Sequence, residues 1–133
     1  MSGWIKVNTD GSAIGSPSIS GAGGIFRNFK GYVKGASAFN TCTSFAYIAE
    51  LKAVMFAIHK AKELGWCNMW IECDSTCVVH LLQSRSLEVP WTIQQQGDSC
   101  LVDLQSLCIV VSHTYREGNA VADKLAKFSI QHS

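Results

Sequence analysis

Four carboxylates in this sequence mark points where regular patterns begin, end or are interrupted. Asp10 and Asp74 each follow a short strand-like segment, and Asp123 lies in the first turn of a C-terminal helical pattern. Glu50 lies inside a long helical pattern whose residues three and four positions away are alanine, tyrosine or valine. A carboxylate on such a stripe loses hydration, which raises its pKa unless a cation or a hydrogen-bond donor compensates.

Carboxylates that converge on one spot repel each other, and proteins tolerate this mainly where divalent cations bind between them. Oxygen ligands alone suit Mg²⁺ or Mn²⁺ better than Zn²⁺. Two such ions about 3.5–4 Å apart can cleave a phosphodiester, because one activates the attacking water and the other stabilises the leaving oxygen. The four acids therefore raise the hypothesis of a two-metal site, provided that the fold brings them together.

Each acid also has an ordinary structural explanation. Asp10 could form a turn, Asp74 could cap a helix, and Asp123 could interact favourably with a helix dipole by about 0.3–1 kcal/mol. Glu50 could lie at the rim of a core-facing helix surface. These alternatives stay open until the positions of the four side chains are known.

The elements that must position the acids can be predicted from hydrophobic periodicity. Residues 4–10 alternate and predict a strand that ends at a turn over residues 10–12. Residues 21–27 and 32–39 predict two further strands around a tight turn at residues 28–31. Three strands joined by short connections indicate an antiparallel meander.

Beyond the meander the period changes to that of a helix. Residues 44–64 predict one long helix with Ser44 as N-cap and Gly65 as its stop. Residues 69–73 predict a strand, and Asp74 or Ser75 then caps a helix that runs to about residue 84. If this strand lies parallel to the first one, Asp10 and Asp74 are neighbours at the carboxyl edge, where open α/β sheets bind ligands.

The last third predicts a linker at residues 85–90, a weaker helix over 91–106 interrupted by Gly97, and a strand over 107–114. Asn119 is expected to cap a final helix over residues 120–131. The complete order, three strands followed by alternating helices and strands, predicts a mixed sheet with helices packed against it.

Composition and charge limit the classes of function. The chain has 133 residues, of which 47% are hydrophobic and 16% charged, so we expect one compact domain over residues 1–133. Neither a bilayer-spanning apolar run nor a signal peptide is recognisable, and we expect a location inside the cell, nuclear or cytoplasmic, without a membrane partner. The net charge of +1 predicts weak binding of nucleic acid by this domain alone.

Six cysteines occur without the C-x-x-C spacing of a zinc site. Because the chain is long enough to fold without cross-links, we expect reduced and mostly buried thiols.

Five short blocks of the sequence together resemble the ribonuclease H superfamily. They are most similar to the plant ribonuclease H-like domain found in retroelement-derived proteins. The resemblance covers about residues 4–128 and rests on five blocks: 8–12 (NTDGS), 22–27 (AGGIFR), 49–51 (AEL), 72–75 (ECDS) and 116–126 (REGNAVADKLA). Each block alone is weak, whereas all of them in order at the correct intervals are specific.

The resemblance implies a ribonuclease H-like α/β fold, with a five-stranded mixed sheet whose first three strands are antiparallel. It also implies a metal-dependent endonuclease that hydrolyses the RNA strand of an RNA–DNA hybrid and leaves a 3′-hydroxyl and a 5′-phosphate. The implied cofactor is two Mg²⁺ ions, with Mn²⁺ as substitute. The implied site comprises the catalytic, metal-binding acids Asp10, Glu50, Asp74 and Asp123, with Gly11, Ser12 and Ser75 as substrate contacts that read 2′-hydroxyls.

The chain departs from the family pattern in three places. Asparagines that precede the helical glutamate in many members are replaced by Ala46 and Tyr47, and the basic, tryptophan-rich protrusion of some members is missing. The loop histidine of some members has no clear equivalent, since His113 fits a structural or edge position better. The alternative is therefore a nucleic-acid-binding module with weak or lost catalysis, and a third possibility is an exonuclease or strand transferase of the same fold. We expect a monomer that forms part of a larger retroelement-derived polypeptide.

Overall fold

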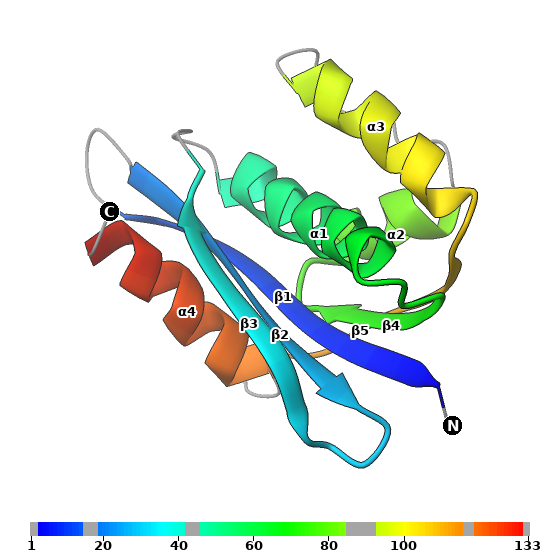
Figure 1. The fold of residues 1–133 in the computed structure, drawn as a ribbon. Coiled ribbons are helices and arrows are strands. Elements are labelled where there is room, and N and C mark those ends of the chain that lie inside the picture. Colours follow the sequence, from blue (N-terminus) through cyan, green and yellow to red (C-terminus); the bar gives the residue numbers. More distant parts are fainter. Residues whose placement is uncertain (1–2, 15–18, 42–45, 85–92, 116–118, 132–133) are drawn as a thin grey trace.

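The computed structural model describes residues 3–14, 19–41, 46–84, 93–115 and 119–131. Five strands form one sheet in the order β3-β2-β1-β4-β5 (Figure 1). The elements in chain order are β1 (Trp4–Ile14), β2 (Ile19–Asn28), β3 (Val33–Asn40), α1 (Ala46–Glu63), β4 (Asn68–Cys73), α2 (Thr76–Ser84), α3 (Gln94–Leu104), β5 (Cys108–His113) and α4 (Ala120–Gln131). Antiparallel pairing joins β1, β2 and β3, and parallel pairing joins β1, β4 and β5. The predicted mixed sheet is confirmed.

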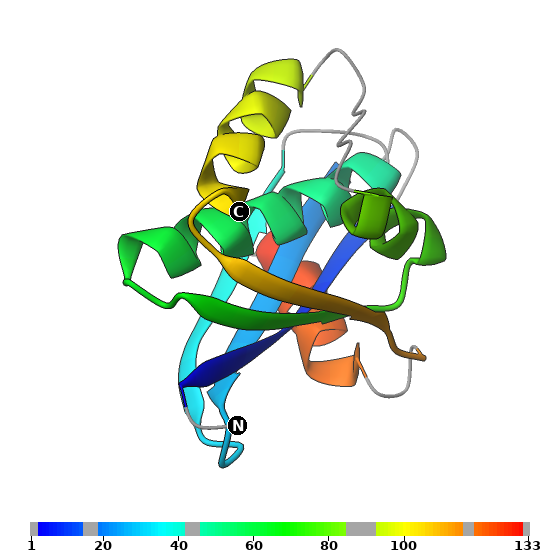
Figure 2. The same cartoon turned by 90° about the vertical axis from the view of Figure 1, so that its right-hand side faces the viewer.

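Helices cover the sheet from both sides (Figures 1 and 2). On one side α1 packs on β1 and β2, and α3 packs on α1 rather than on the sheet. On the other side α4 packs on β1, β2 and β3. β1 therefore lies at the centre of the sheet with a helix on each face, which is where side chains from both layers can meet.

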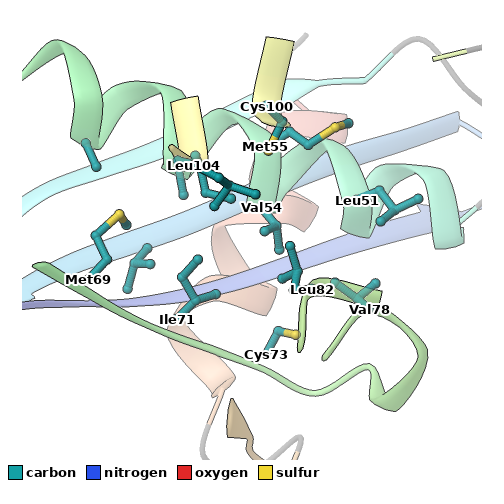
Figure 3. Close-up of a cluster of buried hydrophobic side chains, with 14 of the residues drawn as sticks. Leu51, Val54, Met55, Met69, Ile71, Cys73, Val78, Leu82, Cys100 and Leu104 are labelled. Carbon is teal, nitrogen blue, oxygen red and sulfur yellow. The ribbon is translucent and has the colours of Figure 1, made fainter. Parts of the chain in front are cut away.

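The main hydrophobic core lies between α1 and the sheet (Figure 3). Leu51 and Val54 of α1 are almost completely buried, as are Met69 and Ile71 of β4. Leu104 brings α3 into the same cluster. Each fully buried large aliphatic side chain contributes roughly 1.5–3 kcal/mol, so this cluster fixes the position of α1 on the sheet.

Two glycines allow the helices to approach the central strands closely. A Cβ on Gly11 of β1 would overlap the backbone of Glu50 in α1. A Cβ on Gly23 of β2 would lie 2.5 Å from the Ala122 carbonyl oxygen and 2.6 Å from the Ala126 nitrogen of α4. Both positions therefore require glycine because helix backbone occupies the space of a side chain.

The prediction that the first strand ends at a turn over residues 10–12 is wrong. β1 continues to Ile14 and pairs with β2 along its whole length, so Gly11 serves close packing inside a strand and not a turn. The parallel pairing with β4, however, stops at Thr9 and Cys73. Asp10 is thus the first residue of β1 beyond this pairing, in the same way that Asp74 is the first residue beyond β4.

Helix ends agree with the sequence in part. α1 ends at Glu63, two residues before Gly65, whose φ is +73°, and α2 begins after Ser75, whose Oγ accepts a hydrogen bond from Val78 N–H at 3.3 Å. Ser75 rather than Asp74 is therefore the capping side chain. The predicted cap at Ser44 and the predicted linker at residues 85–90 lie outside the described residues.

Two details of the C-terminal third differ from the prediction. Gly97 is buried in α3 and does not interrupt it. The helix continues because one glycine costs a helix only about 1 kcal/mol. Asn119 precedes α4, but its Nδ2 donates a hydrogen bond of 2.7 Å to the Thr9 carbonyl. Among the described residues its Oδ1 accepts no hydrogen bond, so this side chain ties α4 to β1 and does not cap the helix.

Thiols are less buried than expected. Cys73 and Cys100 are buried, whereas Cys67, Cys77 and Cys108 are exposed, and all five are free. The described helices include none that is long and apolar enough to cross a bilayer.

Candidate metal centre

Three of the four predicted acids lie together. One carboxylate oxygen from each of Asp10, Glu50 and Asp74 lies within 4.8 Å of the other two. They come from β1, α1 and the junction between β4 and α2, which are separate stretches of the chain. Asp10 is 6% exposed, and Glu50 and Asp74 are half-buried.

The placement of each acid follows from the fold. Parallel register pairs Thr9 with Cys73, so the next residues, Asp10 and Asp74, emerge side by side at the carboxyl edge. Glu50 reaches the same place because the missing side chain of Gly11 lets its backbone lie against β1. The expected convergence of these three acids is therefore a consequence of strand register and one glycine contact.

Mutual repulsion is visible in the properties of Asp10. Burial, the charge of Asp74, and a hydrogen bond and charge from Asp123 raise the pKa of Asp10 from 3.8 to about 8, with a smaller contribution from Glu50. A carboxyl group with this pKa is costly to ionise near neutral pH. A bound cation would remove that cost by compensating the negative charges around it.

Asp123 occupies an adjoining position. It lies in the first turn of α4 and hydrogen-bonds through its side chain to Asp10. Its Oδ2 also lies 3.0 Å from Lys127 Nζ, one helical turn later. The group of three close carboxylates does not include Asp123. The structure therefore places the fourth acid next to the cluster, with a cation of its own.

The ion pair of Lys127 with Asp123 was not predicted from the sequence. The spacing of four residues between them is the usual spacing of an ion pair on a helix surface, and that signal could have identified it.

The three predicted substrate contacts have different surroundings. Gly11 is buried beneath α1, Ser12 is half-buried in β1, and Ser75 caps α2 with its hydroxyl oxygen. Ser75 and Gly11 directly adjoin the clustered acids in the sequence. Their contact with substrate stays a prediction.

His113 lies beside the acidic cluster rather than within it. It is exposed at the end of the edge strand β5, and its Nε2 lies 3.3 Å from the carbonyl oxygen of Asp74. Its ring also meets Tyr115 edge to face, with the centroids 5.6 Å apart. These contacts agree with an edge position for this histidine.

The donor set fits a hard divalent cation. Glu50, Asp74 and Asp10 offer only oxygen atoms, and sulfur or imidazole donors are not part of the group. Oxygen-only sites favour Mg²⁺, Mn²⁺ or Ca²⁺ over Zn²⁺. The cluster can therefore hold a cation of this class, and the raised pKa of Asp10 agrees with the gathering of carboxylates around it.

Comparison with known proteins places the chain in a family. A family model described as "Reverse transcriptase-like" matches residues 8–129, which is nearly the whole chain and includes all four acids. The chain belongs to this family. The candidate site therefore lies within a reverse transcriptase-like domain.

Relatives and solved structures extend this assignment. The chain is 34% identical over 131 residues to an Arabidopsis thaliana protein named "Putative ribonuclease H protein", covering 96% of this chain and 20% of that relative. It therefore spans about one fifth of the relative's length.

Among solved structures, RNase H1 from Halobacterium salinarum superposes with a TM-score of 0.85 at 18% identity, covering 98% and 99% of the two chains. LC11-RNase H1, solved in complex with an RNA/DNA hybrid, gives 0.84 at 23% identity over 96% and 97%. The fold of this reverse transcriptase-like domain is that of ribonuclease H.

Proposed function

We propose that this domain is a metal-dependent nuclease that hydrolyses the RNA strand of RNA–DNA hybrids. Water would add to the phosphorus, the bond to the 3′ oxygen would break, and the products would carry a 3′-hydroxyl and a 5′-phosphate. The observation that carries the proposal is the close approach of three carboxylates from separate elements. The family and the fold support it, because the hybrid-bound relative shares the architecture.

In this proposal Asp10, Glu50 and Asp74 hold divalent cations, and Asp123 completes the site from α4. Mg²⁺ or Mn²⁺, when bound, would supply the activation of water and the stabilisation of the leaving oxygen. Asp10 must be ionised to bind a cation, so it would release its proton on binding. Asn119 and Gly23 hold α4 against the central strands, which keeps Asp123 near Asp10.

Recognition of the RNA strand is assigned to the hydroxyls nearest the acids. Ser75 Oγ accepts a hydrogen bond from Val78 N–H, so its hydroxyl proton can be donated to a 2′-hydroxyl. Ser12 lies in β1 two residues beyond Asp10. We propose that Ser12 and Ser75, together with the backbone at Gly11, contact the substrate.

A hybrid-cleavage assay tests the proposal. Wild-type protein is incubated with a labelled RNA–DNA hybrid in Mg²⁺ and, separately, in Mn²⁺, with RNA–RNA, DNA–DNA and single-stranded RNA as comparison substrates. Cleavage should require the metal, occur in the hybrid only, and fall by at least about 10²-fold in Asp74→Asn. Glu72→Gln is the matched control, because Glu72 precedes Asp74 by two residues and is outside the acidic cluster.

Absence of metal-dependent cleavage at high protein concentration, with a functional control nuclease in the same tube, would contradict the proposal. Cleavage retained in Asp74→Asn would contradict the assignment of the site.

One observation favours the second candidate, a binding module with weak or lost catalysis. Lys127 lies 3.0 Å from Asp123 and neutralises part of the charge that the fourth acid would bring to the site. Hybrid binding without turnover, measured under the same conditions, would identify this function.

A further inference from the structure

A second surface lies on the face of β1 that carries Asp10, toward the start of the strand. We call it the N-terminal sheet patch and define it as Trp4, Lys6, Arg27, Phe29 and Trp70, which line a cavity of about 300 Å³ together with Asn28 and Gly31. Side chains alternate along a strand, so Trp4 and Lys6 share a face with Asp10. Arg27 of β2 and Trp70 of β4 are the register partners of Lys6 on either side.

Helices leave this part of the face accessible. α4 packs on β1, β2 and β3, whereas α2, which contacts β4 and β5, lies on the opposite side of the sheet with α1 (Figures 1 and 2). Val110 of β5, the register partner of Trp70, is 49% exposed as a result. Phe29 at the β2–β3 turn is 52% exposed. The patch is therefore a surface with large aromatic side chains in contact with solvent.

Trp70 is held in place and carries a cation. Its Nε1 donates a hydrogen bond of 2.7 Å to Ser112 Oγ, which fixes the ring on the sheet. Lys6 Nζ lies 4.4 Å from the centre of that ring and 3.3 Å from Glu72 Oε1. Lys6 is therefore oriented above the sheet by an aromatic ring and one carboxylate.

Positive charge exceeds negative charge in the patch. Arg27 forms no ion pair with any of the described residues, and Lys30 Nζ lies 5.8 Å from the ring centre of Phe29. The patch thus carries the cations Lys6 and Arg27, with Lys30 beside it at Phe29, and the carboxylate paired with Lys6 is Glu72, although the whole chain has a net charge of only +1. Local charge complementarity selects an anionic partner.

We infer that the N-terminal sheet patch binds a segment of single-stranded nucleic acid. Bases stack on Phe29 and Trp4, and phosphates contact Arg27 and Lys6, which is the combination of aromatic and cationic side chains that holds single strands without reading sequence. Four to six residues of strand separate Lys6 and Trp4 from Asp10, a distance of about 13–20 Å. The patch is therefore separate from the metal centre, and this inference stands without the proposed cleavage.

Fluorescence anisotropy with the full chain tests the inference. Labelled 15-nucleotide single strands, one RNA and one DNA, are titrated in about 50 mM salt with EDTA, so that no divalent cation bridges the oligonucleotide to the acids. Phe29→Ala should weaken binding at least about fivefold, the loss of one stacked base. Phe128→Ala is the matched control, because Phe128 of α4 is also 52% exposed, and it should bind like wild type.

Charge reversal supplies the second arm. Arg27→Glu should weaken binding. It should also reduce the slope of log K against log salt by about one, because one phosphate contact is lost. Lys124→Glu makes the same change of charge on the exposed side of α4 and should alter neither quantity comparably. Circular dichroism of each variant verifies folding before binding is compared.

Several results would overturn the inference. One is wild-type protein that binds neither oligonucleotide. Another is an equal loss of oligonucleotide affinity in Phe29→Ala and Phe128→Ala. A third is wild-type protein that binds anionic lipid vesicles but not oligonucleotides. Asp74→Asn should bind the single strand as wild type does. Loss of cleavage in that variant with retained binding therefore separates a failure of the nuclease proposal from a failure of this one.

Discussion

Two buried aspartates lie near opposite ends of α1. Other carboxylates surround Asp10, whereas basic side chains pair with Asp103. Asp10 is 6% exposed, and its burial together with the neighbouring Asp74, Asp123 and Glu50 raises its pKa to about 8. Asp103 of α3 is 8% exposed, and its two oxygens lie 3.3 Å from His59 Nδ1 and 3.4 Å from Lys62 Nζ, both on α1.

Burial alone therefore does not indicate a functional acid. Asp103 is satisfied by side chains of the chain itself, and an ion-paired acid of this kind is a structural feature. Burial and the neighbouring carboxylates disfavour the charged form of Asp10, and a cation from solution would compensate it. The difference between the two ends of α1 is what makes one of them a candidate metal centre.

The largest effect is expected from a substitution that disrupts the acidic end alone. Gly11→Ala places a methyl group on the backbone of Glu50, so α1 must move from β1 and the three carboxylates must separate. We expect the free energy of unfolding, from urea titration, to fall by about 3 kcal/mol or more, and hybrid cleavage to be lost. Gly35→Ala is the control, since its nearest contact would be the Phe26 ring at 3.9 Å. A Gly11→Ala protein as stable as wild type would contradict the close approach.

The second effect has the opposite sign. Asp10→Asn removes a charge that its neighbours disfavour, so the metal-free protein should become more stable at pH 8, by on the order of 2 kcal/mol. The same variant should lose cleavage and most of the stabilisation by Mg²⁺ or Mn²⁺. Urea unfolding in EDTA and thermal melts with each metal measure these quantities. A destabilised, metal-free Asp10→Asn would show that the acidic end is not strained.

A pH titration gives the same comparison without changing the wild-type chain. Folded protein holds the Asp10 proton up to about pH 8, whereas the unfolded chain releases it near pH 3.8. The folded state binds more protons across this window, so the contribution of Asp10 to the free energy of unfolding is complete below about pH 4 and is lost as pH rises toward 8. The difference between Asp10→Asn and wild type, in EDTA, should therefore grow with pH. A constant difference would contradict the raised pKa.

The paired acid should respond in the opposite direction to Asp10. Asp103→Asn removes the carboxylate that pairs with Lys62 and His59, although His59 keeps Glu63 at 3.1 Å, and we expect the free energy of unfolding to fall by about 1–2 kcal/mol at pH 7. Activity per folded molecule and the response to Mg²⁺ should not change. A stabilised Asp103→Asn would remove the contrast between the two ends of α1.

The sequence predicted the fold well because its signals are local. Alternation in β1 and the apolar period of α1 identified the elements, and their order predicted the mixed sheet. It failed at Gly11, because a glycine after an aspartate is typical of a turn and nothing local shows that α1 needs the space. It failed at Gly97 because glycine lowers helix propensity without preventing a helix that packs on α1.

The candidate site divides in the same way. Convergence of Asp10 and Asp74 could be predicted from strand order. Glu50 and Asp123 were candidates from their positions in helical patterns, and the resemblance to ribonuclease H implied that they share the same site. The contacts that modify these acids arise from tertiary structure and could not be predicted. Asn119 bonds to the Thr9 carbonyl across the whole sequence, and the position of His113 beside Asp74 depends on the parallel register of β4 and β5.

The smallest expected effect tests whether Asp123 belongs with the acidic group around Asp10 or is an ion-paired acid like Asp103. Lys127 is 51% exposed and pairs with Asp123 one turn away on α4, so Lys127→Ala should change the free energy of unfolding by no more than about 0.5 kcal/mol. If the pair competes with a cation for Asp123, the variant should reach half of its Mn²⁺-induced thermal shift at about a twofold lower Mn²⁺ concentration. Lys124→Ala, on the same helix without this pair, should not. Weaker Mn²⁺ binding in Lys127→Ala would mean that the lysine orients Asp123 for the site, and Asp123 would then resemble Asp103 in depending on a cation of the chain.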